Sequence, residues 1–518
     1  MRLRQVPWTV PLFSLFVVST SVLANSSSAS SPLLDPILNA IEQASRQAVE
    51  PIELRCPPIG DMGFGPIWEA PAGDAAVLEL SRRFPLIATA TTYRSHIREK
   101  PEAGAAIMGH VRYGRYLRAA EAGGECEGGH WHEVVGGGFI CSGEYFHVGD
   151  APLEVRGTYA APNTADIEPY RYAKAIKGSP RFSSLPSPEQ LAELDEDPDA
   201  ELDIIQERLN GAYFLAVDRE ATVAGQKLLH TSAGLWVRAA DAEWIPRSPM
   251  HGELLGPERE LPIAFVHRDR TRLLCPDPNA RGTAVASVQG GAAVAGQAGE
   301  DAPAAGDAPA GDAAGAAVSG EAARPPPLGW RVCGSAGKHA RFAVRRTERI
   351  GDAELVIGPE DWAAEREALR IARAIERPDG IPAGERWMHI DLGEQTLVAY
   401  QDDEPLLATL VSSGLDSHAT PTGTYRVQRR YIVKTMRGPD PDHGVYEVGE
   451  VPWTFYYYGN YAVHGAYWHN VFGNQRSHGC TNVPPADARW LFGWLGPRLG
   501  EGWNARLYRE SGWTHFTD

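Results

Sequence analysis

The chain has 518 residues, of which 43% are hydrophobic and 22% are charged, so it is neither a disordered polymer nor a multi-span membrane protein. Lys and Arg number 49 and Asp and Glu 66, which gives 49 − 66 = −17, and an excess of negative charge argues against nucleic acid as a partner. At roughly 150 residues per domain the length predicts three or four folded units, and 54 Gly and 40 Pro favour short strands over helical bundles.

The first 24 residues have the features of a secretory signal peptide. Arg2 and Arg4 provide a positive start, and the uncharged, mostly apolar run from Val6 to Leu23 ends in small residues, which predicts cleavage after Ala24. An uncleaved membrane anchor is the alternative, although prolines and hydroxyl residues interrupt the run. We expect a chain exported across the inner membrane to the periplasm or cell envelope, with no membrane span after cleavage.

The sequence after the signal peptide predicts first a spacer and then a set of short strands. Residues 25–81 are predicted to be a spacer with one peripheral helix. From 82 to 150, short apolar runs at 86–90, 107–111 and 137–141, separated by turn residues, predict the strands of a small β-barrel. The turn at 109–114 and the strand at 137–141 give this segment a resemblance to the SH3-like modules of bacterial cell-wall enzymes.

Two further regions precede the C-terminal segment. Residues 151–256 suggest no function, and a helical stretch is expected around Pro188 to Leu209. Residues 257–376 are predicted to form a second SH3-like module, with strands expected at Leu261 to Val266 and Ala340 to Val344. It is interrupted at 283–327 by a sequence of Ala, Gly, Asp, Pro and Glu that cannot fill a core and is expected to be a disordered loop.

Six cysteines must be placed in an oxidising compartment. Cys126 and Cys141 flank an expected hairpin, so a local disulfide is predicted between them, and closing such a loop stabilises by about 3 kcal/mol in the chain-entropy model. Cys275 and Cys333 bracket the insertion and are predicted to bridge its base. If Cys480 is free, Cys56 has no partner.

Residues 377–518 are dense in aromatic residues and strands. They begin with an expected β-hairpin, with strands at 388–392 and 396–400 around a three-residue turn. A strand at 406–412 follows, and then a Thr-Pro-Thr-Gly turn at 420–423 for which a structural role is sufficient.

The chemistry is predicted to lie at two short motifs, Val463-His464-Gly465 and Ser477-His478-Gly479-Cys480-Thr481-Asn482. A cysteine beside histidines is a metal ligand, a redox site or an activated nucleophile. The spacing of His464, His469, His478 and Cys480 fits no familiar zinc signature, and a disulfide would need a distant partner. Taken alone, His469 is interpreted as an ordinary hydrogen-bonded residue.

Together with the hairpin and the Thr-Pro-x-Gly turn, these motifs resemble the catalytic domain of the L,D-transpeptidases, the YkuD family, over about residues 387–494. The resemblance implies a mainly β, multidomain chain that ends in a β-sandwich with short helices, preceded by SH3-like modules. It places Cys480 as the nucleophile and His464 as the general base, oriented by the carbonyl of Gly465. Backbone amides near Gly479 would form the oxyanion hole. Ser477, His478 and Asn482 would shape the loop that presents the thiol.

The reaction implied by the resemblance is acyl transfer between peptidoglycan stem peptides, without a metal or organic cofactor. The thiolate of Cys480 attacks the L-centre carbonyl of the third residue of a donor tetrapeptide, D-Ala leaves, and an acceptor amine resolves the thioester to a 3→3 cross-link. Three alternatives stay open: transfer to water, which is L,D-carboxypeptidase activity; attachment of an envelope protein's lysine; and a wall-binding scaffold with an inactive domain.

Overall fold

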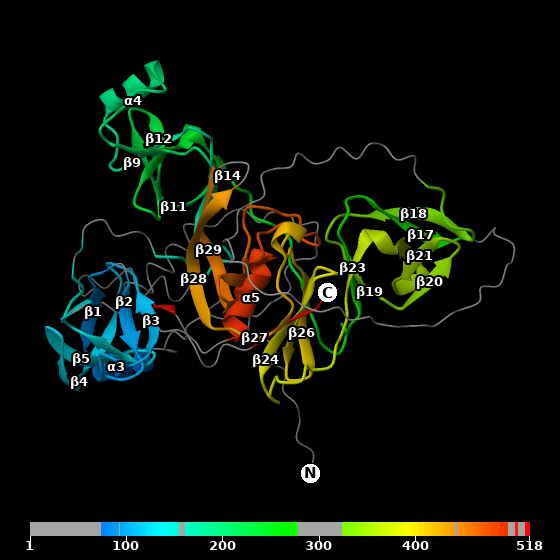
Figure 1. The fold of residues 1–518 in the computed structure, drawn as a ribbon, viewed down its shortest axis with the longest axis horizontal. Helices are drawn as coiled ribbons and strands as arrows, with labels where there is room; N and C mark the ends of the chain where they lie inside the picture. Colours follow the sequence, from blue (N-terminus) through cyan, green and yellow to red (C-terminus); the bar gives the residue numbers. More distant parts are fainter. Residues whose placement is uncertain are drawn as a thin grey trace, which may run out of the picture. The chain divides into compact units, whose positions relative to one another are not determined.

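The computed structural model describes residues 74–92, 94–143, 145–153, 155, 161–277, 324–440, 444–495, 503–505 and 513–517. In these residues most regular structure is β-sheet and helices are few, as expected for a mainly β chain (Figure 1). The predicted signal peptide, residues 25–73 of the predicted spacer, where a helix was expected at Leu33 to Glu50, Cys56, and nearly all of the insertion at 283–327 lie outside the described residues. Residues 74–81 of the spacer are described and belong to a helix. The described helices include none that is both long and apolar enough to cross a membrane.

The first sheet contains the strands predicted for residues 82–150, and those at 86–90 and 107–111 have the expected bounds. Helix α3 (Asp74–Arg83) precedes it. In sheet order the strands are β32 (Trp503–Ala505), β3 (Ile107–Val111), β2 (Ser95–Arg98), β6 (Phe139–Cys141), β5 (Gly129–Val134), β4 (Tyr116–Cys126), β1 (Leu86–Ala90) and β7 (Phe146–Gly149). The likeness of this segment to an SH3 module stays a prediction.

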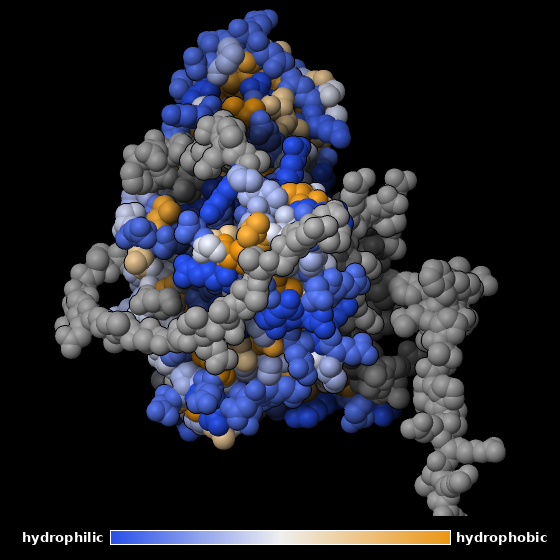
Figure 2. Space-filling model, turned by 90° about the vertical axis from the view of Figure 1, so that its right-hand side faces the viewer, coloured by the Kyte–Doolittle hydropathy of each residue, from blue (hydrophilic) through white to orange (hydrophobic). Residues whose placement is uncertain are grey.

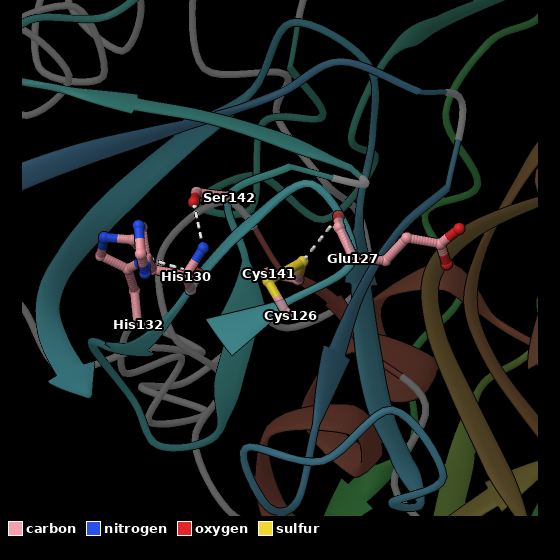
Figure 3. Close-up of a disulfide and its surroundings, with 6 residues drawn as sticks. All are labelled: Cys126, Glu127, His130, His132, Cys141 and Ser142. Atoms are coloured by element: carbon pink, nitrogen blue, oxygen red, sulfur yellow. Dashed lines mark hydrogen bonds between the residues drawn. A yellow bond between two sulfur atoms is a disulfide. The ribbon is translucent and has the colours of Figure 1, made fainter. Parts of the chain in front are cut away.

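Both predicted disulfides are present. Cys126 at the end of β4 bonds to Cys141 at the end of β6, 15 residues away (Figure 3). The turn between β4 and β5 lies beside this bridge, where the His130 amide donates to Ser142 Oγ at 2.9 Å. Cys275 bonds to Cys333 and so joins the two strands that border the insertion. The first pair was predicted from an expected hairpin, and the second from the position of its cysteines on either side of the insertion.

The segments before and after the insertion at 283–327 pair with each other in two sheets. Leu261 to Val266 and Ala340 to Val344 were expected as strands, and Ile263–Val266 (β16) pairs antiparallel with Arg341–Ala343 (β19). The remaining strands of this region complete a three-stranded sheet, β19-β16-β23, and a five-stranded one, β18-β17-β22-β21-β20; they are β17 (Thr271–Pro276), β18 (Trp330–Ala336), β20 (Arg346–Ile350), β21 (Ala353–Ile357), β22 (Ala363–Glu365) and β23 (Leu369–Ala372).

The helix expected around Pro188 to Leu209 is shorter than predicted. Helix α4 (Pro188–Glu196) begins at a capping box made by Ser187 and Gln190, and it ends at Asp197. Pro198 explains the end, because a residue before proline is disfavoured in helical conformation. Residues 205–208 then form strand β10 instead of helix.

An 11-stranded sheet joins the region without a predicted role to the C-terminal segment. Strand β11 (Ala212–Val223) pairs parallel with β29 (Gly444–Tyr458), so that Phe214 lies opposite Val448. The other strands of the sheet are β8 (Arg171–Ala175), β9 (Pro180–Phe182), β10 (Ile205–Arg208), β12 (Gln226–Thr231), β13 (Trp236–Arg238), β14 (Ala242–Trp244), β28 (Arg429–Asp440), β30 (Tyr461–Gly465) and β31 (Thr481–Val483). The segment boundaries suggested by the sequence stay predictions.

The expected C-terminal hairpin is present in a six-stranded sheet. Asp391 pairs with Thr396, so that the turn has four residues, 392–395, one more than predicted. In sheet order the strands are β15 (Glu253–Leu254), β26 (Glu404–Leu410), β25 (Thr396–Gln401), β24 (Arg386–Asp391), β33 (Trp513–Thr517) and β27 (Gly423–Arg426).

One apolar core connects this sheet with β28 to β31, which is the arrangement of a sandwich. Met388 and Leu397 of the six-stranded sheet share that core with Phe455 and Val463 of the larger one. Helix α5 (Pro485–Leu495) packs on β29 and β30 (Figure 1). Outside such cores, the face in Figure 2 carries mostly polar residues around small, separate apolar patches.

We expect the first disulfide to hold strands β4 to β6 together. Replacing both Cys126 and Cys141 by Ser should reduce the free energy of local unfolding by about 3 kcal/mol, because the open chain regains the entropy of a loop of this length. Hydrogen exchange of the amides in β4 to β6 measures the change. The control is Glu125→Ala, an exposed neighbour, and equal exchange in the double variant and the parent would contradict the expectation.

A second prediction concerns Glu168, which is 5% exposed and whose burial raises its pKa from 4.5 to about 7, although Arg247 lies near. A raised pKa in the folded state means that stability is full below pH 4.5 and is lost as pH rises through 7. We expect Glu168→Gln to remove most of this loss, which amounts to as much as about 3 kcal/mol. Denaturant unfolding at pH 4 to 8 tests it, with exposed Glu193→Gln expected to keep the parental slope.

Candidate active site

The candidate catalytic residues lie on two neighbouring parallel strands. In the pairing of β30 with β31, His464 lies opposite Asn482 and Val463 opposite Thr481. Cys480 comes directly before β31, two residues from Asn482. The thiol lies against β30, because the amide of Ala462, two residues before His464 on that strand, contacts Cys480 Sγ at 3.3 Å. The strand pairing thus brings together the two segments that carry Cys480 and His464, which are sixteen positions apart in the sequence.

The Cys480 thiol is enclosed by the backbone of the turn before β30. The Ala462 amide donates to Sγ at 3.3 Å, and Sγ lies 3.7 Å from the Asn460 carbonyl, to which it donates. The residue is 2% exposed, and it is a free cysteine. An amide N–H that donates to sulfur stabilises the thiolate, which is the nucleophilic form of cysteine.

The His464 ring is oriented by the backbone of the following residue. Nδ1 lies 3.3 Å from the Gly465 carbonyl oxygen, which can only accept, so that Nδ1 carries the proton. Nε2 is then left as the acceptor that a general base requires. The ring is fully buried and lies 5.6 Å from the ring of Trp468.

The loop before Cys480 is held by its own first residue. Ser477 Oγ donates to the Cys480 carbonyl and accepts from the Gly479 amide at 3.1 Å. Gly479 has φ of 113°, and a Cβ at this position would lie 2.5 Å from Cε1 of Tyr461. Only glycine therefore fits here. The Gly479 amide is engaged within the loop, so it must leave Ser477 Oγ before it can bind an oxyanion.

Thr420, which the sequence assigns to a turn, contacts the catalytic loop. Its Oγ1 donates to the Gly479 carbonyl at 2.8 Å and accepts from the Gly414 amide at 2.9 Å. Backbone bonds continue on the same side, because Ser412 exchanges two hydrogen bonds with Asn482, at 2.8 and 2.9 Å. The segment after β26 therefore supports the loop and the start of β31.

Asn482 contacts the histidine that was interpreted as ordinary. Its amide nitrogen Nδ2 lies 2.9 Å from Nε2 of His469. Burial lowers the pKa of His469 well below 6.5, with Arg476 and His464 adding to the effect, so that this ring is neutral at pH 7. The other amide atom, Oδ1, is buried and has no hydrogen-bond partner among the described residues. It is an acceptor beside the thiol and the imidazole.

The remaining loop residue, His478, lies among aromatic rings. Its ring is 4.7 Å from that of His418 and 6.0 Å from that of Tyr446. On the other side of the loop, burial raises the pKa of Tyr461, and the charge of a Cys480 thiolate raises it further. Tyr461 stacks with Tyr458, with 6.1 Å between the ring centroids.

Sequence reasoning missed three contacts at the site. Thr420 and Tyr461 were within the quoted motifs, but nothing in their spacing shows that they touch Gly479. His469 gave no signal beyond its residue type. In the described ranges, no group of three or more His, Cys, Asp and Glu side chains is arranged to hold a metal ion.

Comparison with known proteins identifies the segment that carries the site. Residues 385–500 match the YkuD family, described as the L,D-transpeptidase catalytic domain. This C-terminal segment is therefore an L,D-transpeptidase catalytic domain by its sequence. No curated protein matches the chain.

Solved structures of L,D-transpeptidases are also similar to part of the chain. One from Xylanimonas cellulosilytica is 22% identical and aligns over 27% of this chain and 64% of its own, with a TM-score of 0.21. A cysteine-to-serine mutant from Enterococcus faecium is 21% identical over 26% and 50%, with a TM-score of 0.22. One from Mycobacterium smegmatis is 18% identical over 33% and 77%, with a TM-score of 0.22. The alignment with this chain thus spans 64% of the length of the X. cellulosilytica structure and 50% of the length of the E. faecium mutant.

We expect Gly479→Ala to strain the loop. The positive φ and the close approach to Tyr461 should reduce the free energy of unfolding by about 1–3 kcal/mol. The matched control is Gly493→Ala in α5, where a Cβ meets nothing within 4 Å and should raise stability by about 0.5–1 kcal/mol. Thermal unfolding and hydrogen exchange of β30 and β31 measure both, and equal stability of the two variants would contradict the packing described.

Proposed function

We propose that this chain is a peptidoglycan L,D-transpeptidase in which Cys480 is the nucleophile and His464 the general base. The observation that supports this most is the position of the Cys480 thiol against β30, the strand that carries His464, inside the segment that matches the catalytic domain family. The substrates are donor and acceptor stem peptides of the cell wall.

In the first half-reaction the donor peptide acylates the enzyme. His464 Nε2 takes the thiol proton, the thiolate attacks the L-centre carbonyl of the third residue, and a C–S bond forms. The backbone amide of Cys480 is positioned for the developing oxyanion, together with that of Gly479 if it leaves Ser477 Oγ. The C–N bond to D-Ala then breaks, and His464 returns its proton to the departing amine.

In the second half-reaction an acceptor amine replaces the sulfur. The amine attacks the thioester carbonyl, loses a proton to His464, and forms an amide bond as the C–S bond breaks. The thiol is regenerated by that proton. The acyl group stays activated as a thioester throughout, so no nucleotide is consumed.

Burial of the site favours an amine over water as the acceptor. Cys480 is 2% exposed and His464 is fully buried, and excluding water protects a reactive acyl intermediate from hydrolysis. Buried acceptors such as Asn482 Oδ1 suit the amide N–H of a bound peptide, since no described residue satisfies that oxygen.

The proposed location is the periplasm or cell envelope. Residues 1–24 support export by their composition, and the two disulfides are typical of an oxidising compartment. The SH3-like modules would then bring the chain to the wall, and an envelope protein's lysine is a further acceptor to be tested.

The test is incubation of the purified chain with disaccharide-tetrapeptides, followed by mass spectrometry of the protein and of the products. We expect a thioester adduct on Cys480 and cross-linked dimers. Cys480→Ala should form neither, and His464→Gln should slow acylation about 10²- to 10⁴-fold because the base is lost.

The matched control is His147→Gln at an exposed position of the first sheet, which should react like the parent. Tripeptide without dimer would indicate carboxypeptidase activity. Cross-linking by the Cys480→Ala protein would overturn the mechanism, and an unreactive parent would favour the scaffold alternative.

A further inference from the structure

A second site for chemistry lies outside the segment that matches the family. The loop at 256–260 and the chain around β19 enclose a cavity of about 420 Å³. This volume is typical of ligand pockets. Ile263 and Phe342 provide apolar wall, and the rest is formed mainly by charged side chains and His339.

His339 is the most unusual residue of the wall. It has φ of 67°, in the left-handed region that a histidine rarely adopts, and its amide is fixed to the Val266 carbonyl at 2.7 Å. The side chain is 3% exposed, and no described residue hydrogen-bonds its Nε2. Burial lowers its pKa to about 3, with Lys338 adding to the effect, so that the ring is neutral. Strain and an unsatisfied buried nitrogen cluster at functional sites.

The charged groups of the wall divide into a paired set and an unpaired set. Glu253 contacts both Arg341 and Arg259, so these three charges compensate one another. Glu258 and Glu260 have no ion pair within the described part of the chain, nor does Lys338. The cavity therefore presents two carboxylates and one ammonium group to a ligand.

Lys338 also connects the cavity to the candidate active site. Its Nζ donates to the Asn470 carbonyl at 2.8 Å. Asn470 follows His469, whose ring contacts Asn482 on the catalytic strand. Lys338 of the cavity wall and Asn482 of β31 thus contact adjacent residues of one loop, Asn470 and His469.

We propose that this cavity binds the end of a peptide that carries both a free amine and a free carboxylate, and that it positions such peptides beside the catalytic loop. Lys338 and the Nε2–H tautomer of His339 would bind the carboxylate, and Glu258 and Glu260 the ammonium group. The identity of this peptide, a wall stem ending in diaminopimelate, rests on the proposed function. The preference of the cavity for a ligand with both charges is independent of that function.

The experiment measures binding without turnover, in the full chain carrying Cys480→Ala. A stem tripeptide that ends in diaminopimelate is titrated by calorimetry, beside the same peptide with its free amine acetylated. We expect acetylation to weaken binding at least tenfold. His339→Gly and Lys338→Ala should each weaken binding of the free peptide at least tenfold. The glycine also relieves the left-handed φ, so that this variant should melt no lower than the parent.

Two matched controls keep the result specific. Ala224→Gly replaces another residue with positive φ, in the β11–β12 turn, and Lys227→Ala removes an exposed lysine of β12; neither should change binding. Equal binding by His339→Gly and parent, equal binding of the acetylated peptide, or no binding by the parent would overturn the proposal.

Acylation of Cys480 by tetrapeptide, measured separately in the parent, distinguishes the two proposals. If the parent is acylated but His339→Gly binds the peptide as well as the parent does, the proposed function is supported and the role of the cavity is contradicted. If binding of the zwitterion depends on His339 but Cys480 is not acylated, the role of the cavity is supported and the proposed function is contradicted.

Discussion

The site depends on the parallel pairing of β30 with β31. This pairing sets His464 opposite Asn482 and thereby brings Cys480 against the strand that carries His464. The strand is fixed from its other side, because Ser412 and Asn482 exchange two backbone hydrogen bonds. A shift of one residue in either pairing would turn the thiol to the opposite face. The register of these strand pairings therefore decides whether the side chains of the candidate site can meet.

Because the thiol is buried, the polar backbone groups of the loop before β31 are buried with it and need hydrogen-bond partners. Every polar group taken from water there needs a partner, and Ser477 and Thr420 satisfy the carbonyls of Cys480 and Gly479. The Tyr461 ring occupies the space where Gly479 lacks a side chain. The result is a rigid loop with few free acceptors, and Asn482 Oδ1 is one of them.

Segments outside the family match complete the surroundings of the site. Lys338 and Ser248 bind Asn470 through its carbonyl and its side chain, and Arg370 binds the Gly473 carbonyl at 2.7 Å. The loop at 469–476 is thus held by the two regions that precede the catalytic domain. These two regions therefore have a direct structural part in holding the loop that contacts Asn482.

The sequence alone determined what depends on neighbours along the chain: the hairpin at 388–400, the strands at 86–90 and 107–111, the disulfide between Cys126 and Cys141, and the two motifs of the candidate site. It overestimated the helix that begins at Pro188, because Pro198 disfavours helical conformation at Asp197. Only the tertiary structure decided the pairing of β11 with β29, the contacts of Thr420 and His469 with the loop, and the cavity at His339. Those contacts join residues tens to hundreds of positions apart. Periodicity and turn residues report local conformation, whereas which distant surfaces meet is set by packing of the whole chain.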